Sequence, residues 1–431
     1  MPVEPPVLWS VVEKHLDDAG FQWTPRWERA HVSPVLRAYE VASGIEEQLA
    51  ANVDALAIAA PHASAKLLEP ALTGDEPGEA AVAALALLGV PTGFLLVRRA
   101  LTGGEGQRTA VVRALALSDR VGLEREVEPQ LREQHPAGVV AALEVFAARR
   151  LDPGAGLFAF LTSSDTEVAV AALRAARTST QRVRSAIEHA FGVGEARVRE
   201  AALETGLVLG FHSALEASRK LAASGAPSAV ALATLAMSGA VADLALVEGA
   251  LSNPGLRRVA LFALGFAGRS GSMEKVLESM QVPGLARGAG EAFSAITGIA
   301  IDGELVAWEG EDEQSAEDDP SAGLLPGQDG DLPLPDASAA EARWAAVRSR
   351  FDPAVRYLDG EPFTPQRLVE AFRSASMRRR RFLALELATR SRRTRLVDTR
   401  AWARDQLVAE RRDAPPMFSD AAAPLSRVLV N

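Results

Sequence analysis

The stretches VAVAALRAA (residues 168–176) and VREAALETG (residues 198–206) are two copies of one helical pattern, and this pattern decides the fold. Both place a leucine among small residues and a charged residue at intervals, as expected of a helix packed closely between neighbours. Six further segments repeat the pattern. Anchoring each copy on its central apolar residue gives spacings of 28 to 32 residues between Leu85, Leu115, Leu143, Leu173, Leu203, Leu232, Leu261 and Phe293.

A period near 30 residues holds two helices and two turns, which is the size of one helical repeat. Turn-forming residues separate the copies, and Asp165, Ser228 and Asn253 stand where helix N-caps are expected. The pattern is similar to the short, bacterial kind of HEAT repeat. We therefore predict an all-α fold, an α-solenoid of about eight HEAT-like helix pairs over residues 61–300, with all anchors buried. An irregular helical bundle is the alternative, and the regular spacing disfavours it.

The second helix of each pair is expected to line the concave face of such a stack. The polar positions of these helices are therefore candidate protein-binding residues: Arg113, Glu144, Arg174, Arg199, Glu200, Glu204, Arg257 and Arg258. The alternative is that they are ordinary solvated side chains, as most charged residues on helices are.

Residues 1–60 are predicted to form an N-terminal helical cap. One helix should span about 7–19 and end at Gly20. A second should begin at Ser33, an N-cap followed by proline, and run to about residue 59. Trp23 and Trp27 lie four residues apart on one helical face, and we expect them in the core rather than on a ligand platform.

The composition changes after the array. Residues 301–340 form an acidic linker rich in Gly and Pro, and residues 309–336 hold too little apolar surface to offset the entropy of ordering, which predicts disorder. Residues 341–431 form an Arg-rich C-terminal helical module. There Thr364 and Pro365 should start a helix that runs to about residue 374, and the segment from Met377 repeats the pattern of the array, which predicts one further helix pair. A helix near 399–412 and an irregular tail after residue 414 are expected to follow.

Four consecutive arginines, Arg378, Arg379, Arg380 and Arg381, begin the second helix of that pair. They turn through about 300°, so they cannot share one face, and the helix macrodipole disfavours cations at this end. One interpretation is that they are solvated or loosely paired with the acidic linker. The other is that they bind an acidic partner surface, since guanidinium groups bind carboxylates well.

The 431 residues carry a formal net charge of −10 and include no cysteine. The acidic balance argues against a general nucleic-acid binder, and the missing cysteines exclude disulfides, thiol nucleophiles and zinc–thiolate sites. The histidines form no metal-binding motif, and the chain has neither a phosphate-binding glycine loop nor a G-x-S-x-G sequence. We therefore expect no enzyme activity, no cofactor, no metal and no small-molecule substrate.

The sequence begins without the basic and apolar regions of a signal peptide. Its most apolar stretch, residues 229–251, carries Asp243 and Glu248, so a buried pair of helices explains it better than a membrane span. We expect a cytoplasmic protein that does not bind membranes.

The segments AGFQWTPRW (19–27), IEEQLAANVDALAIA (45–59), GEAFSAITGI (290–299), RYLDGEPFTPQRL (356–368) and MRRRRFLALELA (377–388) resemble an uncharacterised proteobacterial family of HEAT-like repeat proteins. The family is abundant in myxobacteria, and some members are encoded beside type VI secretion genes. The resemblance implies a bacterial cytoplasmic protein that is an accessory of a secretion apparatus. The family has no established activity, so it implies no functional residue here.

Three functions compete. The first is a protein–protein interaction scaffold that uses an extended groove, with partners that the sequence cannot name. The second is a HEAT-like nucleic-acid binder or DNA glycosylase-type enzyme, which needs a basic groove, whereas these helices mix Arg with Glu. The third is a lyase-type or chaperone subunit of the kind found among short HEAT-repeat proteins. The sequence favours the scaffold.

Overall fold

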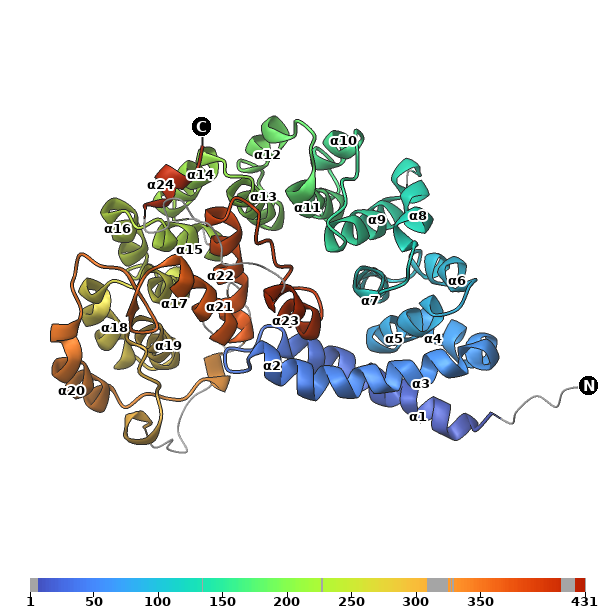
Figure 1. The fold of residues 1–431 in the computed structure, drawn as a ribbon, viewed down its shortest axis with the longest axis horizontal. Coiled ribbons are helices and arrows are strands. Elements are labelled where there is room, and N and C mark those ends of the chain that lie inside the picture. Colours follow the sequence, from blue (N-terminus) through green and yellow to red (C-terminus); the bar gives the residue numbers. More distant parts are fainter. Residues whose placement is uncertain are drawn as a thin grey trace, which may run out of the picture. The chain divides into compact units, whose positions relative to one another are not determined.

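The computed structural model describes residues 7–133, 135–225, 228–307, 325, 327, 329–411 and 423–430. These residues are mostly helical (Figure 1), and the prediction of an all-α protein is confirmed. One antiparallel pair of very short strands, β1 (Tyr357–Leu358) and β2 (Glu361–Pro362), lies outside the predicted array. The described part of 61–300 contains no strand.

The chain packs into two compact units. Unit 1 comprises the described parts of Met1–His31, Ala38–Ala190 and Asp398–Val408. Unit 2 comprises Val32–Arg37 and the described parts of Phe191–Val397 and Ala409–Asn431. The repeat array of residues 61–300 therefore contributes helices to both units, and each unit also takes a piece of the C-terminal module.

Unit 1 is built from alternating longer and shorter helices: α1 (Trp9–Gln22), α2 (Ala38–Glu40), α3 (Glu47–Ala63), α4 (Glu69–Thr73), α5 (Pro77–Leu88), α6 (Gly93–Ala100), α7 (Glu105–Leu117), α8 (Leu123–Val127), α9 (Pro136–Ala148), α10 (Leu157–Leu161), α11 (Thr166–Ala175), α12 (Arg184–Ala190) and the start of α23 (Ala403–Arg411). The anchored helices pack in order, α5 on α7, α7 on α9 and α9 on α11. Leu115, Leu143 and Leu173 are buried as predicted, whereas Leu85 is only partly buried.

Unit 2 continues the alternation: α13 (Ala196–Val208), α14 (His212–Ala223), α15 (Ala229–Met237), α16 (Val241–Ala250), α17 (Arg257–Ala267), α18 (Met273–Met280), α19 (Ala286–Thr297), α20 (Ala337–Val347), α21 (Pro365–Ser374), α22 (Met377–Arg390) and α24 (Leu425–Val428). Here α13 packs on α15, α15 on α17 and α17 on α19, and their anchors Leu203, Leu232, Leu261 and Phe293 are all buried. The further helix pair predicted in the C-terminal module is α21 and α22, which pack on each other.

The predicted N-caps are confirmed. Asp165, Ser228 and Thr364 each accept a hydrogen bond from a backbone amide in the first turn of α11, α15 and α21. Asn253 does the same for a short 3-10 turn, Pro254–Leu256, that leads into α17. A side-chain oxygen satisfies amides that would otherwise lack a partner, which is why these local signals can be read from sequence.

The expectation that the first helix ends at Gly20 is wrong. α1 continues to Gln22 and then through a π-helical turn, Trp23–Glu28. Gly20 instead allows α1 to approach α5, because a Cβ on Gly20 would lie 2.7 Å from Cγ and 3.1 Å from the backbone nitrogen of Glu79. From the other side, a Cβ on Gly78 would lie 2.3 Å from the carbonyl oxygen of Gly20. The glycine therefore serves close helix packing rather than helix termination.

The second N-terminal helix starts later than predicted. Ser33 Oγ accepts from the amides of Val35 and Leu36, but no helix follows directly. Residues 33–37 instead pair with the start of α22, where the Met377 amide donates to the Leu36 carbonyl at 2.8 Å. The helical backbone begins at Ala38, passes through a π-helical turn (Val41–Glu46) and continues as α3.

Two predictions of irregular structure also need correction. Of the linker, residues 309–324, 326 and 328 lie outside the described residues, but 329–336 are folded: Leu332 is buried, Pro335 bridges to Val306, and Asp336 caps α20. Of the tail, residues 412–422 lie outside the described residues, but α24 forms beyond them and Val430 pairs with Phe211. The helix predicted near 399–412 begins at Ala403.

Candidate functional site

A short segment of the C-terminal module, Asp398–Val408, belongs to unit 1, and we call it the arm. Arg400 Nη1 donates to Glu144 Oε2 at 2.8 Å, and Arg174 Nη1 donates to Oε1 of the same carboxylate at 2.5 Å. Arg113 donates to the backbone carbonyl of Arg400. Three of the predicted binding residues, Arg113 in α7, Glu144 in α9 and Arg174 in α11, thus meet at the arm, and we call them the charged row.

One buried carboxylate, Glu144, pairs with two guanidinium groups at this row. Burial raises the pKa of Glu144, but Arg400 and Arg174 lower it further, so that the pKa falls to about 2. Burial and the neighbouring Arg400 lower the pKa of Arg113 to about 9, against the attraction of Asp398 and Glu144. All these groups stay charged at neutral pH, and the arm is held by a charge-assisted contact.

Trp402 is the apolar anchor of the arm. Its ring centroid lies 5.0 Å from that of Trp27 and 6.2 Å from that of Trp23. Its Nε1 donates to the carbonyl of Leu117, the last residue of α7, at 3.0 Å. Trp23 and Trp27 are fully buried, which confirms that they belong to the core. An indole that is buried with its N–H satisfied contributes much of the stability of a contact of this kind.

Glu46, buried at the end of the π-helical turn before α3, holds the backbone of the arm. It accepts hydrogen bonds from the amides of Ala403 at 2.7 Å and Arg404 at 3.1 Å, the first residues of α23. It also accepts from Trp27 Nε1 at 2.9 Å and His31 Nε2 at 3.0 Å. A carboxylate at a helix N-terminus is favourable because the amides there point outward unpaired.

The same contacts set the protonation states of Glu46 and His31. Burial raises the pKa of Glu46, but its four hydrogen bonds lower it overall, and burial lowers the pKa of His31 below its usual value. The carboxylate is therefore charged while His31 donates as a neutral imidazole. Four bonds occupy the lone pairs of Glu46, so it holds the arm rather than acting as a base toward a substrate.

The arrangement holds an arginine, a tryptophan two residues later, and the start of a helix. Glu46, Arg400 and Trp402 are absent from the residues predicted from the sequence. Arg400 lies 256 residues from Glu144, and Ala403 lies 357 residues from Glu46, so no local pattern encodes these contacts. The one local signal is a tryptophan between arginines at the start of an otherwise polar helix.

The five other candidates of the array lie in unit 2, and each bonds to groups of the chain itself: Arg199 to the carbonyls of Val193 and Gly194, Glu200 to Ser228, Glu204 to Arg381, Arg257 to the carbonyl of Leu251, and Arg258 to the carbonyl of Gly284 and to Asp329. The structure does not gather them around one feature as it gathers the charged row. Within unit 2, Glu204 contacts Arg381 of α22, and Arg258 contacts Asp329 of the folded segment 329–336.

The expectation that Arg378 to Arg381 are solvated is wrong for the first three. Arg378 is buried and donates to Asp329, at 2.6 Å, and to Glu291. Arg379 donates to the Gly265 carbonyl at 3.3 Å and lies over the ring of Phe266. Arg380 donates to the Phe372 carbonyl at 2.8 Å and to Glu410. These guanidinium groups hold α22 in unit 2 and do not form an exposed surface for an acidic partner.

The fourth arginine differs. Arg381 has a side chain that is 43% exposed, and its Nε donates to Glu204 at 2.9 Å. Farther along α22, Glu386 accepts two hydrogen bonds from Arg356, at 2.6 and 2.8 Å, and one from Arg390 at 2.7 Å. Burial raises the pKa of Glu386, and the two guanidinium groups lower it below its ordinary value. Buried charges of this kind are tolerated because they are paired.

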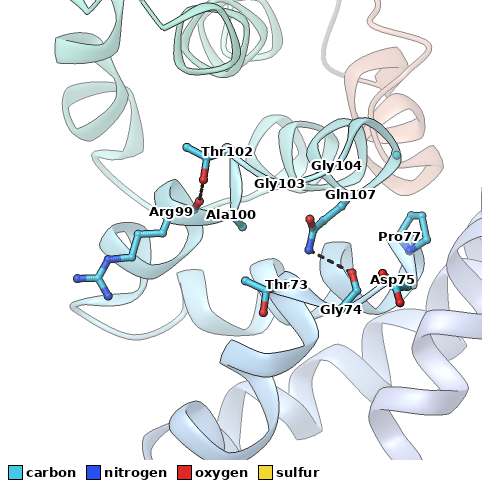
Figure 2. Close-up of a pocket in the computed structure, with 11 residues that line it drawn as sticks. Thr73, Gly74, Asp75, Pro77, Arg99, Ala100, Thr102, Gly103, Gly104 and Gln107 are labelled. Carbon is cyan, nitrogen blue, oxygen red and sulfur yellow. Dashed lines mark hydrogen bonds between the residues drawn. The ribbon is translucent and has the colours of Figure 1, made fainter.

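An open depression of about 390 Å³ in unit 1 lies between the end of α4 and the start of α7 (Figure 2). Its charged residues are Asp75 and Arg99, and the Arg99 side chain points away from the depression. Gln107 reaches across and donates to the carbonyls of Leu72 and, at 3.2 Å, Gly74. These two bonds clamp the loop before α5.

Among the residues that the structure describes, no three His, Asp or Glu side chains gather as metal ligands would. None of the described helices combines the length and the apolar composition that a membrane span requires. No protein-family model matches this chain, and neither a curated protein nor a solved structure does.

Proposed function

We propose that this chain is a non-enzymatic protein-binding scaffold, built as an α-solenoid of HEAT-like helix pairs. The ordered packing of α5, α7, α9 and α11, and of α13, α15, α17 and α19, supports the repeat architecture. Repeats of this kind create extended surfaces from equivalent positions of successive helices. The proposal includes a role as a cytoplasmic accessory of a bacterial secretion apparatus.

The observation that carries the proposal is the arm on the charged row. Glu144 in α9 and Arg174 in α11 directly follow their anchors, and Arg113 in α7 lies one turn away on the same helix face. All three side chains contact the arm at Arg400 or at its carboxylate partner. A scaffold binds a partner segment with the same means: side chains from successive helices, one apolar anchor and bonds to the backbone.

Affinity capture with matched surface variants tests this function. Thr109 is exposed in α7, one turn before Arg113 and on the same helix face. Thr162 is also exposed but follows α10, one of the alternate helices. The tagged chain is used to capture proteins from its native host, and bound proteins are quantified by mass spectrometry.

A partner of the proposed surface is retained by the wild type and by Thr162→Arg but lost by Thr109→Arg. A role at a secretion apparatus further requires components of that apparatus among the lost proteins. The scaffold function is rejected if no protein is enriched over a tag-only control, or if both variants retain the same proteins in the same yield.

A further inference from the structure

The arm is held through three features that a peptide from another protein could equally supply. They are the guanidinium of Arg400 on Glu144, the indole of Trp402 against Trp27, and the two amides at the start of α23 on Glu46. All of the receiving groups belong to unit 1. The contacts therefore define a sequence preference, Arg-x-Trp followed by the first turn of a helix.

Each receiving carboxylate keeps at least one hydrogen bond when the arm leaves, and its Oε2 is the atom that becomes available. Glu144 keeps its bond from Arg174, and Glu46 keeps its bonds from Trp27 and His31. A vacated polar site is usually unstable because a buried charged group is left without a partner. Removing the arm does not create this condition, because each buried carboxylate keeps a partner. A site of this kind can exist empty.

The chain around the arm also marks it as a separable segment. Residues immediately before the arm, up to Val397, and after it, from Ala409, belong to unit 2. Arg392 and Arg393 precede the arm with φ angles of 49° and 68°. Their amides donate to the carbonyls of Thr389 and Ala388, so they end α22 by a sharp turn that belongs to unit 2 and does not depend on the arm.

We propose that the arm is an internal substitute for a ligand, and that unit 1 binds an Arg-x-Trp segment of a partner protein in place of the arm. The inference rests on the proposed scaffold function and names the chemistry of its partner. The partner supplies a cation to Glu144 and an indole to the aromatic cradle, because these are the two side chains that the site accepts from the arm. The intact arm competes at high effective concentration, so it sets a threshold that the partner must exceed.

The probe is a fluorescein-labelled peptide with the sequence of residues 397–410, titrated with the full chain and followed by anisotropy. The main receiver is the double variant Arg400→Ala/Trp402→Ala, whose own arm has lost both anchors. Circular dichroism and a thermal melt establish that it is folded. If it is not, Arg400→Ala alone is the receiver, since the side chain of Arg400 is 38% exposed and contributes little to the core.

We expect the peptide to bind the receiver at least about tenfold more tightly than the wild-type chain, whose arm occupies the site. Peptides with alanine at the position of Arg400 or of Trp402 should lose about tenfold or more in affinity. Adding Glu144→Gln to the receiver should weaken the parent peptide but not the peptide that already lacks arginine. This pattern would assign the arginine to Glu144 itself.

The proposal is overturned if a folded receiver does not bind the peptide, or if the alanine peptides bind as well as the parent. It is also overturned if light scattering shows that the wild-type chain dimerises with rising concentration and Trp402→Ala abolishes the dimer, because the occupant is then the arm of a second copy. Loss of captured proteins in Thr109→Arg, without any peptide binding, would leave the scaffold function standing and reject this inference alone.

Discussion

Replacing Glu144 by glutamine should destabilise unit 1, because it leaves the guanidinium groups of Arg174 and Arg400 beside each other without their carboxylate. The depressed pKa of Glu144 gives the magnitude. A fall from 4.5 to about 2 is a shift of about 2.5, which corresponds to about 3 kcal/mol of stability at neutral pH. Breaking a buried pair by removing one partner costs a similar amount.

The pKa also predicts how this loss depends on pH. A carboxyl group with a depressed pKa in the folded state stabilises the fold above its unfolded pKa, and the stabilisation disappears as the pH falls through the folded pKa. The difference between wild type and Glu144→Gln should therefore be full at pH 7 and shrink between about pH 4.5 and about pH 2. At pH 3 less than half of the difference at pH 7 should remain.

Urea unfolding followed by tryptophan fluorescence suits this measurement, because Trp23, Trp27 and Trp402 lie together in unit 1. Glu13→Gln is the matched control, since Glu13 is exposed in α1 of the same unit and should change stability by less than about 0.5 kcal/mol. A midpoint for Glu144→Gln equal to that of the control at pH 7 would refute the account of the charged row. So would a difference that stays constant from pH 7 to pH 3.

Three further substitutions test the packing, each by thermal and urea melts. Leu203→Asp puts a charge at a fully buried anchor and should cost several kcal/mol, so a melt within a degree or two of wild type would contradict the burial. Gly78→Ala places a Cβ 2.3 Å from a backbone oxygen and should cost about 1–3 kcal/mol, whereas Gly44→Ala meets nothing within 4 Å and should be neutral or slightly stabilising; equal effects would reject the close helix contact. Arg378→Gln removes the guanidinium partner of Glu291 and leaves Asp329 with Arg258 alone, so it should cost about 3–5 kcal/mol, against less than about 1 for the half-exposed Arg381→Gln, and the reverse order would contradict the assigned pairs.

The all-α fold and its ordered series of packed helices could be predicted from the sequence because the signals are local. A small-residue helix with one large apolar anchor repeats at a nearly constant spacing, and six of the first seven leucine anchors proved buried. Leu85 is the exception and is only partly buried. The caps at Asp165, Ser228 and Thr364 were predictable for the same reason, because each acts on amides two or three residues away.

The errors share a physical cause: they concern residues whose role depends on distant partners. Gly20 looks like a helix terminator until Gly78 is brought against it. Asp329 looks like part of a solvated acidic linker, and Arg378 like part of a solvated basic cluster, but each is buried because it neutralises the other. The four consecutive arginines of α22 point in different directions, and each contacts a different group of unit 2.

The candidate site was half predictable. Arg113, Glu144 and Arg174 were predicted as polar positions of successive helices: Glu144 and Arg174 directly follow their anchors, and Arg113 lies one turn away on the same helix face. That this face holds the arm of the same chain could not be foreseen, since Arg400 reaches Glu144 across 256 residues of sequence. A groove predicted to be open thus proved to have an occupant from the same chain.

Site-specific photo-crosslinking in the native host tests the central claim, a protein-binding face on α7, α9 and α11, most directly. A benzoylphenylalanine is placed at Thr109, beside the charged row, or at Thr162, which follows the alternate helix α10. After irradiation, the account predicts a covalent adduct with another protein from position 109 and none from position 162. Adducts of the same proteins from both positions, or from neither, would contradict it.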